Sequence, residues 1–295
     1  MELNYNSASQ LRAFLEQAGL GMRKKYGQNF LINSGVRQAL VDALGAEAGA
    51  EVWEVGGGLG AMTGLLLEKG FLVRVFEIDP GFASVMRELF GMRQGFTLVQ
   101  GDVMKTWMEQ PAAPYLLGNL PYNIAAALLA NFIERGRLFT RMAVTVQREV
   151  ALRMTARPGS ADYSSFSLLC SSVYTVRPLM VIRGASFYPR PNVDSQGVLL
   201  ERRADISPGS YPSALYPLVR RLFASRRKMI KNNLAAFIAS RTACLGEPGE
   251  LAAGVLAANG IKGEARAETL VLEDFAALAQ TIEDMENKSK DVNRR

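Results

Sequence analysis

The chain alternates between short apolar segments and amphipathic ones from residue 51 to residue 147. The apolar segments, which predict strands, are 52–55, 71–78, 96–100, 115–117 and 141–147. The helical patterns between them cover 61–69, 80–90 and 124–134, and a further helix follows the last strand up to about residue 155. Because strand–helix–strand units join parallel strands, this alternation predicts an open, mostly parallel, doubly wound α/β sheet. Segments near 173–182 and 195–201 are expected to complete the sheet with an antiparallel edge hairpin.

The pattern changes near residue 203. A stretch with three turn-forming residues, 204–213, is followed by helical periodicity alone, over 213–223, 225–240, 248–258 and 272–283. Two further helices are expected ahead of the sheet, over 7–18 and 34–44. We therefore expect an α/β domain over residues 1–203 and a small all-helical domain over residues 204–295.

Three consecutive predicted strands end in residues that suit a nucleoside-containing ligand. The first runs into a glycine loop, in which Gly56, Gly58 and Ala61 fit the G-x-G-x-x-A pattern of a Rossmann-like dinucleotide site. The second ends at Glu77, whose carboxylate can accept hydrogen bonds from both hydroxyls of a ribose. The third is followed by Asp102, which can accept a hydrogen bond from an adenine amine. Taken singly, each has an ordinary structural alternative as a tight turn or a helix cap. Together they indicate a cofactor across the strand ends, and both NAD and S-adenosylmethionine fit.

The amino-acid composition excludes several classes of catalytic and metal-binding site. The chain has no histidine, which excludes Ser-His-Asp hydrolysis and histidine-ligated metal sites, and its two cysteines lack zinc-type spacing, so no metal is expected. The net charge of +6 favours a polyanionic partner. The N-terminus does not resemble a signal peptide, and the apolar run 124–130 is too short to cross a membrane. We expect a cytoplasmic protein without a membrane or obligate protein partner, and a monomer.

The segment after the fourth strand, Asn119-Leu120-Pro121-Tyr122, carries the most specific chemistry. The exocyclic amine of adenine is a poor nucleophile because its lone pair is conjugated with the ring. Two acceptors aimed at its hydrogens, the side-chain oxygen of Asn119 and the carbonyl of Leu120, favour a pyramidal nitrogen. Pro121 fixes the backbone that holds the carbonyl, and Tyr122 offers a flat face for an extruded base. This interpretation predicts adenine N6 methylation and disfavours a dehydrogenase.

The chain resembles the ribosomal small-subunit (16S) rRNA adenine N6,N6-dimethyltransferases, the kasugamycin-sensitivity dimethyladenosine transferases, over about residues 20–280. The resemblance is carried by the glycine loop, Glu77-Ile78-Asp79 and Asn119–Ile124, and by the blocks at 24–31, 146–150, 157–160, 187–195, 223–228, 232–234 and 266–270. It implies a class I methyltransferase domain with S-adenosylmethionine as cofactor. One departure is Gly57, where the family commonly has proline.

The resemblance also assigns residues to roles. The cofactor would contact Asn29, Leu31, Gly56, Gly58, Glu77, Asp102 and Asn119. The target adenine would lie between Tyr122 and Phe187, which is expected in a loop because turn residues surround it. The reaction implied is dimethylation of two adjacent adenosines in the 3′-terminal hairpin of small-subunit rRNA during ribosome biogenesis.

A basic surface is expected in the second domain. No acidic residue occurs from Ser207 to Gly246, and the expected RNA-binding residues there are Arg220, Arg221, Arg226, Arg227, Lys228 and Lys231. Arg227 and Lys231 are spaced i, i+4 and would share a face of the helix expected over 225–240, suited to RNA phosphates. Two alternatives stay open: a large-subunit rRNA adenine methyltransferase that confers antibiotic resistance, and a non-catalytic RNA-binding assembly factor on the same fold.

Overall fold

The computed structural model describes residues 3–23, 26–207, 209–226, 228–241 and 246–292, with side chains up to Lys288. The chain divides into two compact units. The first comprises Met1–Ala151 and Tyr174–Arg202, and the second comprises Leu152–Val173 and Arg203–Arg295. The domain expected over residues 1–203 therefore includes a stretch, 152–173, that the structure groups with the helical unit.

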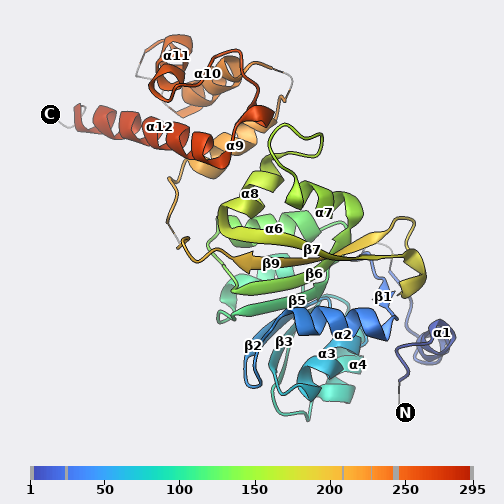
Figure 1. The fold of residues 1–295 in the computed structure, drawn as a ribbon. Helices are drawn as coiled ribbons and strands as arrows, with labels where there is room; N and C mark the ends of the chain where they lie inside the picture. The colour runs from blue at the N-terminus through green and yellow to red at the C-terminus, as the bar shows by residue number, and fades with distance from the viewer. Residues whose placement is uncertain (1–2, 24–25, 208, 227, 242–245, 293–295) are drawn as a thin grey trace. The chain divides into compact units, whose positions relative to one another are not determined.

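The first unit contains a seven-stranded sheet in the order β4-β3-β2-β5-β6-β9-β7 (Figure 1). The strands are β2 (Glu51–Val55), β3 (Leu72–Glu77), β4 (Phe96–Gln100), β5 (Tyr115–Asn119), β6 (Arg141–Gln147), β7 (Tyr174–Ile182) and β9 (Ser195–Arg202). The first five run parallel, and β9 pairs antiparallel with both β6 and β7. The doubly wound sheet and its antiparallel edge hairpin are thus confirmed.

The side chains of consecutive residues in β2 point to opposite faces of the sheet, as strand geometry requires. Val52 is buried in the cluster that also holds Leu40 of α2 (Ser34–Ala43) and Leu66 of α3 (Ala61–Glu68), together with Met86 of α4 (Pro80–Phe90). Trp53 packs in an aromatic group, with ring centroids 4.9 Å from Phe76, 5.4 Å from Phe139 and 6.3 Å from Phe132. Phe132 belongs to α6 (Ala125–Glu134). Helices therefore cover the sheet on both faces, which leaves the strand ends as the place for a ligand.

A short antiparallel pair lies outside the main sheet. Residues 30–31 form β1 and residues 187–188 form β8, with Phe30 opposite Tyr188 and Leu31 opposite Phe187. This pair joins segments more than 150 residues apart in the chain, and the local sequence pattern did not predict it. Ahead of it, α1 (Ala8–Gln17) begins at Ser7, whose hydroxyl accepts from the Gln10 N–H, as expected of a helix cap.

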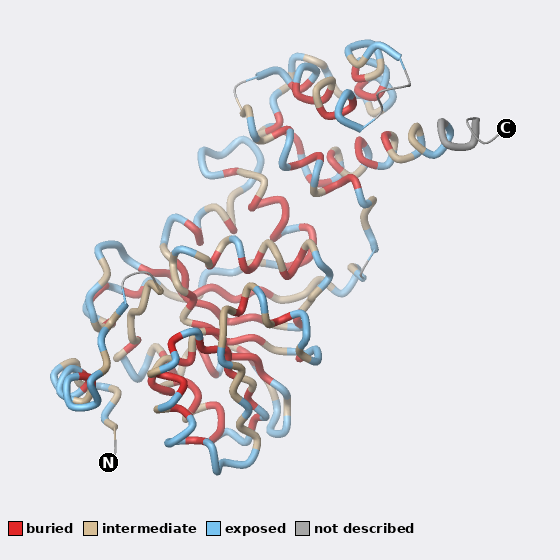
Figure 2. The backbone as a smooth tube through the Cα atoms, turned by 180° about the vertical axis from the view of Figure 1, so that it is seen from behind, coloured by how far each residue is buried: buried red, intermediate tan, exposed pale blue. Residues whose placement is uncertain are grey.

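The second unit is helical. It contains α8 (Ser165–Val173), α9 (Leu215–Phe223), α10 (Ile230–Arg241), α11 (Pro248–Ala258) and α12 (Leu272–Val292), while α7 (Arg148–Thr155) leads into it. Each helix turns one side to a shared apolar core that includes Leu168, Leu218, Leu234 and Phe275, and the buried stretches show as red in Figure 2. Helix α8 was not expected. Helix α10 begins at Ile230, so the helix expected from residue 225 starts about one turn later.

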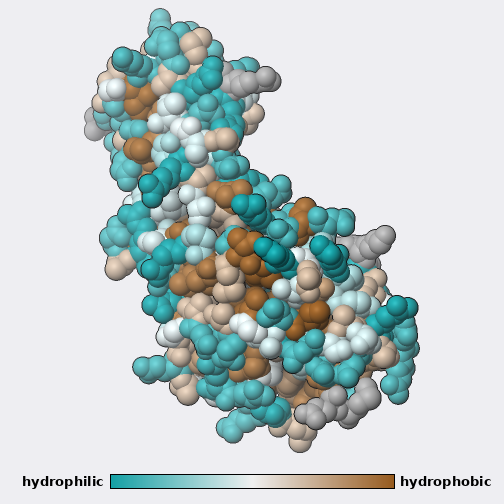
Figure 3. All heavy atoms as spheres, turned by 45° about the vertical axis from the view of Figure 1, so that its right-hand side comes forward, coloured by the Kyte–Doolittle hydropathy of each residue, from teal (hydrophilic) through white to brown (hydrophobic). Residues whose placement is uncertain are grey.

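Among the described residues, no helix is both long and apolar enough to cross a membrane. Hydrophilic side chains cover most of the face shown in Figure 3, with apolar residues (brown) gathered in patches between them.

Candidate functional site

The glycine loop after β2 has a backbone that only glycine adopts easily. Gly56, Gly58 and Gly60 have φ values of +79°, +56° and +87°, in the left-handed region that disfavours any residue with a Cβ atom. The loop turns the chain directly from the end of β2 at Val55 into α3 at Ala61. Its N–H groups and the start of α3 therefore lie at the carboxyl edge of the parallel strands, where anionic or polar ligand groups are readily bound.

A cavity opens at this edge of the sheet. All seven residues expected to contact a cofactor line it, namely Asn29, Leu31, Gly56, Gly58, Glu77, Asp102 and Asn119. They come from β1, the glycine loop and the ends of β3, β4 and β5. The structure thus brings the sequence-predicted set together in one place, and their contacts with a cofactor remain a prediction.

Glu77 holds the glycine loop in place. Its carboxylate accepts from the Gly58 N–H at 2.7 Å through Oε2 and from the Asp79 N–H at 2.8 Å through Oε1. The side chain is 4% exposed, and burial is the main cause that raises the pKa of Glu77 above its ordinary value. Asp79 caps α4 by accepting from Gly81 and Phe82, the ordinary helix-cap role of an acid at this position. Glu77 therefore reaches the cavity from a fixed position.

Asp102 combines two features. Its Oδ1 atom accepts from the Met104 N–H at 2.9 Å and so caps the short helix α5 (Val103–Thr106). The residue also lines the cavity. The helix-cap alternative and the ligand role are compatible, since a carboxylate has further acceptor capacity on its second oxygen.

Asn119 is held from both ends of its amide. Its Nδ2 donates to the Asn29 carbonyl at 2.6 Å, and its Oδ1 accepts from the Thr145 hydroxyl at 2.5 Å. Thr145 lies directly opposite Asn119 on β6 and is fully buried. The two contacts assign the amide orientation and leave one lone pair of Oδ1 for another donor.

The residues that follow Asn119 in sequence lie beside the same cavity. The Leu120 side chain is buried and its N–H donates to the Thr145 carbonyl at 3.2 Å, while Pro121 lines the cavity. The Tyr122 ring is half-buried, and its hydroxyl lies 2.5 Å from the Ser195 hydroxyl. Burial is the main cause that raises the pKa of Tyr122 above its ordinary value. Burial and hydrogen bonds therefore hold the segment beside the cavity.

The expectation for Phe187 needs a correction. The residue does not lie in a loop but in β8, opposite Leu31, and its ring is 3% exposed within the same apolar cluster as Leu31 and Ile182. Packing in the apolar core accounts for this placement. Stacking of a base against Phe187 stays a proposal, and it would require the ring to become accessible.

Three further residues line the cavity that the sequence did not single out: Tyr5, Arg37 and Glu54. The Tyr5 hydroxyl donates to the Leu59 carbonyl in the glycine loop at 2.9 Å. Arg37 had a detectable signal, because it stands one helical turn before Leu40 and Val41 and so occupies the apolar side of α2. A buried charged residue needs polar partners. Arg37 on the apolar side of α2 could therefore have indicated a polar cavity behind this helix.

Gly57, the departure from the family pattern, lies in a filled space. A Cβ atom there would meet the Val75 Cγ1 atom at 2.4 Å and the Met86 Cε atom at 2.7 Å. The side chains of β3 and α4 thus occupy the volume that a larger residue would need. This packing makes the loop compact at Gly57 without proline.

The expected RNA-binding residues of the second unit differ in their exposure and in their contacts. Arg220 and Arg221 on α9, Lys228 in the following turn and Lys231 on α10 are exposed. The Lys231 ammonium is 4.0 Å from the Glu264 carboxylate. Arg227 lies outside the described residues, so the i, i+4 face that it was expected to share with Lys231 stays a prediction.

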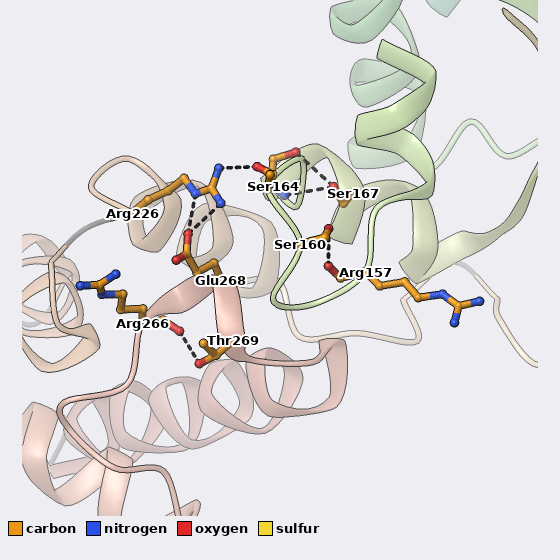
Figure 4. A network of polar contacts seen from close by, with 9 residues as sticks. Arg157, Ser160, Ser164, Ser167, Arg226, Arg266, Glu268 and Thr269 are labelled. Atoms are coloured by element: carbon orange, nitrogen blue, oxygen red, sulfur yellow. Dashed lines mark hydrogen bonds and ion pairs between the residues drawn. The ribbon is translucent and has the colours of Figure 1, made fainter. Parts of the chain in front are cut away.

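Arg226 has internal partners, unlike its exposed neighbours. Its guanidinium is 2.7 Å from the Glu268 carboxylate and donates to the Ala161 carbonyl at 3.0 Å. Figure 4 shows this contact, with the side chains of Arg157 and Arg266 extending away from it. Arg226 therefore ties the loop after α7 to the segment before α12, both parts of the second unit.

A family model and two named relatives agree on methylation of ribosomal RNA. A family model described as ribosomal RNA adenine dimethylase matches residues 19–278. The ribosomal RNA small subunit methyltransferase A of Treponema denticola is 43% identical over 95% of this chain and 96% of its own length. The protein of the same name from Borreliella afzelii is 35% identical over 96% of both chains.

Solved structures agree on the fold. A dimethyladenosine transferase from Plasmodium falciparum matches with a TM-score of 0.75 and 23% identity, over 86% of this chain and 97% of the other. The 23S rRNA methyltransferase ErmE matches with a TM-score of 0.61 and 21% identity, over 86% and 99%. These two likenesses concern the architecture alone.

Proposed function

This chain belongs to the ribosomal RNA adenine dimethylase family, and from that premise we propose that it dimethylates N6 of two adjacent adenosines in the 3′-terminal hairpin of small-subunit rRNA. As a member of the family it is an S-adenosylmethionine-dependent rRNA adenine dimethyltransferase. The proposal extends to ribosome biogenesis in the cytoplasm, with the small subunit as partner and the enzyme acting as a monomer.

The residues of the cavity fit the cofactor. The glycine loop leaves room for a close approach to its backbone, and acidic side chains stand at the ends of two neighbouring strands. Two residues that line the cavity, Arg37 and Glu54, each have one buried polar atom, Nε and Oε1 respectively, without a hydrogen-bond partner among the described residues. A polar ligand would satisfy them, and an apolar one would not. When bound, S-adenosylmethionine supplies an electrophilic methyl group.

The observation that carries the mechanism is the fixed amide of Asn119. Because Asn29 and Thr145 hold it from both sides, its Oδ1 atom can accept from an adenine amine without reorganising. We propose that the Leu120 carbonyl accepts the second amine hydrogen, with Pro121 restricting the backbone. Tyr122 would stack on the extruded base, and Phe187 is its proposed counterpart. Positioning and electrostatics then replace a general base.

The test is the site of modification. Incubation with labelled S-adenosylmethionine and under-methylated small subunits, followed by mapping of modified nucleotides, should give two adjacent dimethyladenosines near the 3′ end of the RNA. Labelling of large-subunit RNA instead would replace the proposed target. Binding of RNA without any labelling would favour the assembly-factor alternative.

We expect Asn119→Ala to lower kcat by about 100-fold or more, the usual effect of removing one such polar contact in a transition state. Binding of small subunits should persist because Asn119 does not belong to the proposed RNA surface. Single-turnover methylation and filter binding measure the two effects. Turnover close to that of the wild type would reject the acceptor mechanism.

A further inference from the structure

The hydroxyl of Tyr122 contacts a hydroxyl from a distant part of the chain, that of Ser195. The two oxygen atoms lie 2.5 Å apart, and either hydroxyl can donate to the other. Among the described residues, neither hydroxyl has another hydrogen-bond partner. Ser195 is fully buried, so within the described chain the contact with Tyr122 is what satisfies its hydroxyl.

Ser195 has a fixed backbone. It is the first residue of β9 and is paired on both sides, with Gln147 at the end of β6 and with Ile182 at the end of β7. Strand residues inside a sheet belong to the most stable part of a fold. The serine side chain has a single torsion angle that places its oxygen, and no solvent reaches it. Ser195 therefore presents its hydroxyl at a well-defined point on the edge where β6 ends.

Tyr122 is held at its backbone by a turn. The Pro121 carbonyl accepts from the Ile124 N–H at 3.1 Å and from the Ala125 N–H at 3.0 Å, so the turn leads directly into α6. The tyrosine ring is half-buried, and the hydroxyl at its far end contacts Ser195. A ring attached at one end through the turn and at the other through a hydrogen bond keeps its direction. Without the hydrogen bond, other staggered rotamers become accessible to the side chain.

Ser195 also lies at the base of the segment that carries Phe187. Segment 183–194 leaves β7 after Ile182 and enters β9 at Ser195, and these two residues are paired with each other. One residue thus contacts Tyr122 and closes the segment that holds Phe187. Ser195 is therefore in a position to relate the two aromatic residues that are proposed to enclose the target adenine.

We propose that Ser195 is a positioning residue for methyl transfer, whose hydroxyl holds the Tyr122 ring in the direction that stacks on the target adenine. The inference rests on the proposed function and adds a residue to its site. Ser195 does not line the cofactor cavity, so it acts through Tyr122. Stacking energy depends on how two rings are tilted, and a ring that is already oriented keeps the base near the methyl donor. The effect therefore belongs to the methyl-transfer step and not to cofactor binding.

A double-mutant cycle on the full chain tests this role, with Ser195→Ala, Tyr122→Phe and the two changes together. Both single changes remove the hydrogen bond, and Tyr122→Phe keeps the aromatic ring. Each should lower the single-turnover rate of adenine methylation on under-methylated small subunits by roughly fivefold, the effect of losing one hydrogen bond between neutral groups. The double variant should be no slower than either single variant, because both changes remove the same interaction.

Binding measurements separate positioning from a general loss of structure. The affinities for small subunits and for S-adenosylhomocysteine should stay within about twofold of the wild type in all three variants. Ser172→Ala is the matched control, since Ser172 is also fully buried, with its hydroxyl 3.2 Å from the Tyr216 hydroxyl, and belongs to the helical unit. It measures the cost of removing a buried hydroxyl and should leave the methylation rate close to that of the wild type.

Three results overturn the inference and leave the proposed function in place. They are a wild-type rate in Ser195→Ala, a wild-type rate in Tyr122→Phe, and a loss from Ser195→Ala that persists in full when Tyr122 is already Phe. If Ser195→Ala does not fold, Ser195→Cys takes its place, because a thiol is only a weak hydrogen-bonding group. Absence of adenine methylation by the wild type overturns the proposed function itself, and this inference with it.

Discussion

Together with the Asn29 carbonyl, Thr145 orients the Asn119 amide, because its hydroxyl donates to Oδ1 from a fully buried position on β6. Without that donor only the Asn29 carbonyl holds the amide, and a rotated amide would turn its NH2 group toward the amine of the proposed substrate. A donor facing a donor repels the amine instead of polarising it. On the proposed mechanism, Thr145 is a positioning residue that acts through Asn119.

Thr145→Val should lower kcat by roughly tenfold, because it removes the hydroxyl and keeps the shape. Thr145→Ser, which retains the hydroxyl, should restore most of the rate. The affinity for S-adenosylhomocysteine should stay close to that of the wild type in both variants. Single-turnover rates with calorimetry measure this separation. A Ser variant as slow as the Val variant would mean that packing of the methyl group, not the hydrogen bond, is important.

Glu54 should make stability depend on pH. Burial, the largest cause, raises its pKa from 4.5 to about 8. The folded state therefore favours the protonated form, and this contribution is fully present below pH 4.5 and is lost as pH rises through about 8. Without ligand, the wild-type Tm should fall over that window, and Glu54→Gln should fall less.

Thermal melts of both proteins between pH 4.5 and 8 measure the difference. Glu51→Gln makes the same charge change at the exposed end of β2 and serves as the control. Parallel curves for wild type and Glu54→Gln would show that the Glu54 carboxyl does not titrate differently in the folded state.

Secondary-structure elements with a strong local signal were predictable from the sequence. The strands that end at Val55, Glu77 and Asn119 combine apolar runs with turn or acidic residues, and the order of these ends places them at one edge of a parallel sheet. The pair of β1 with β8 was not predictable, because two residues carry no periodicity and their partner is distant in sequence. Phe187 was assigned to a loop for that reason.

The polar residues behind the cavity were missed for a different reason. Arg37 and Glu54 lie within an ordinary helix and an ordinary strand, where a charged residue normally faces solvent. Arg37 is buried where Asn6 and Leu31 accept its hydrogen bonds, and Glu54 is buried on β2, a strand inside the sheet. Arg37 had a local signal in its place on the apolar side of α2, whereas the burial of Glu54 depends on tertiary context.

The packing between the glycine loop and its neighbours gives a prediction at the scale of elements. Gly57→Ala should destabilise the protein by about 1–3 kcal/mol, the usual cost of overpacking, since its Cβ would overlap Val75 of β3. Gly64→Ala on α3 is the matched control, because its nearest neighbour would be Phe90 at 3.8 Å. It should be neutral or stabilising. Denaturant unfolding measures both, and equal stabilities would show that the loop adjusts freely.

At the scale of the whole molecule, the basic residues of the second unit are proposed to bind rRNA through its phosphates. Arg221→Glu with Lys228→Glu should weaken binding of small subunits and reduce the salt dependence of binding by about one unit of slope for each phosphate that is no longer neutralised. Lys69→Glu with Arg93→Glu, two exposed residues of the first unit, makes the same charge change and should have a smaller effect. Filter binding across a salt series measures both variants, and equal weakening would indicate a general charge effect.

The chain passes between its two units more than once, and this connectivity limits which fragments of the protein can fold by themselves. The chain leaves the first unit after Ala151, returns to it at Tyr174 and leaves again after Arg202. A fragment that starts at residue 204 therefore lacks α8 with Leu168, and also lacks Tyr163 from the preceding loop, both part of the helical core. Such a fragment would expose an apolar face and aggregate. Exchange of the helical unit between relatives therefore has to carry residues 152–173 along, because the unit consists of two separate stretches of the chain.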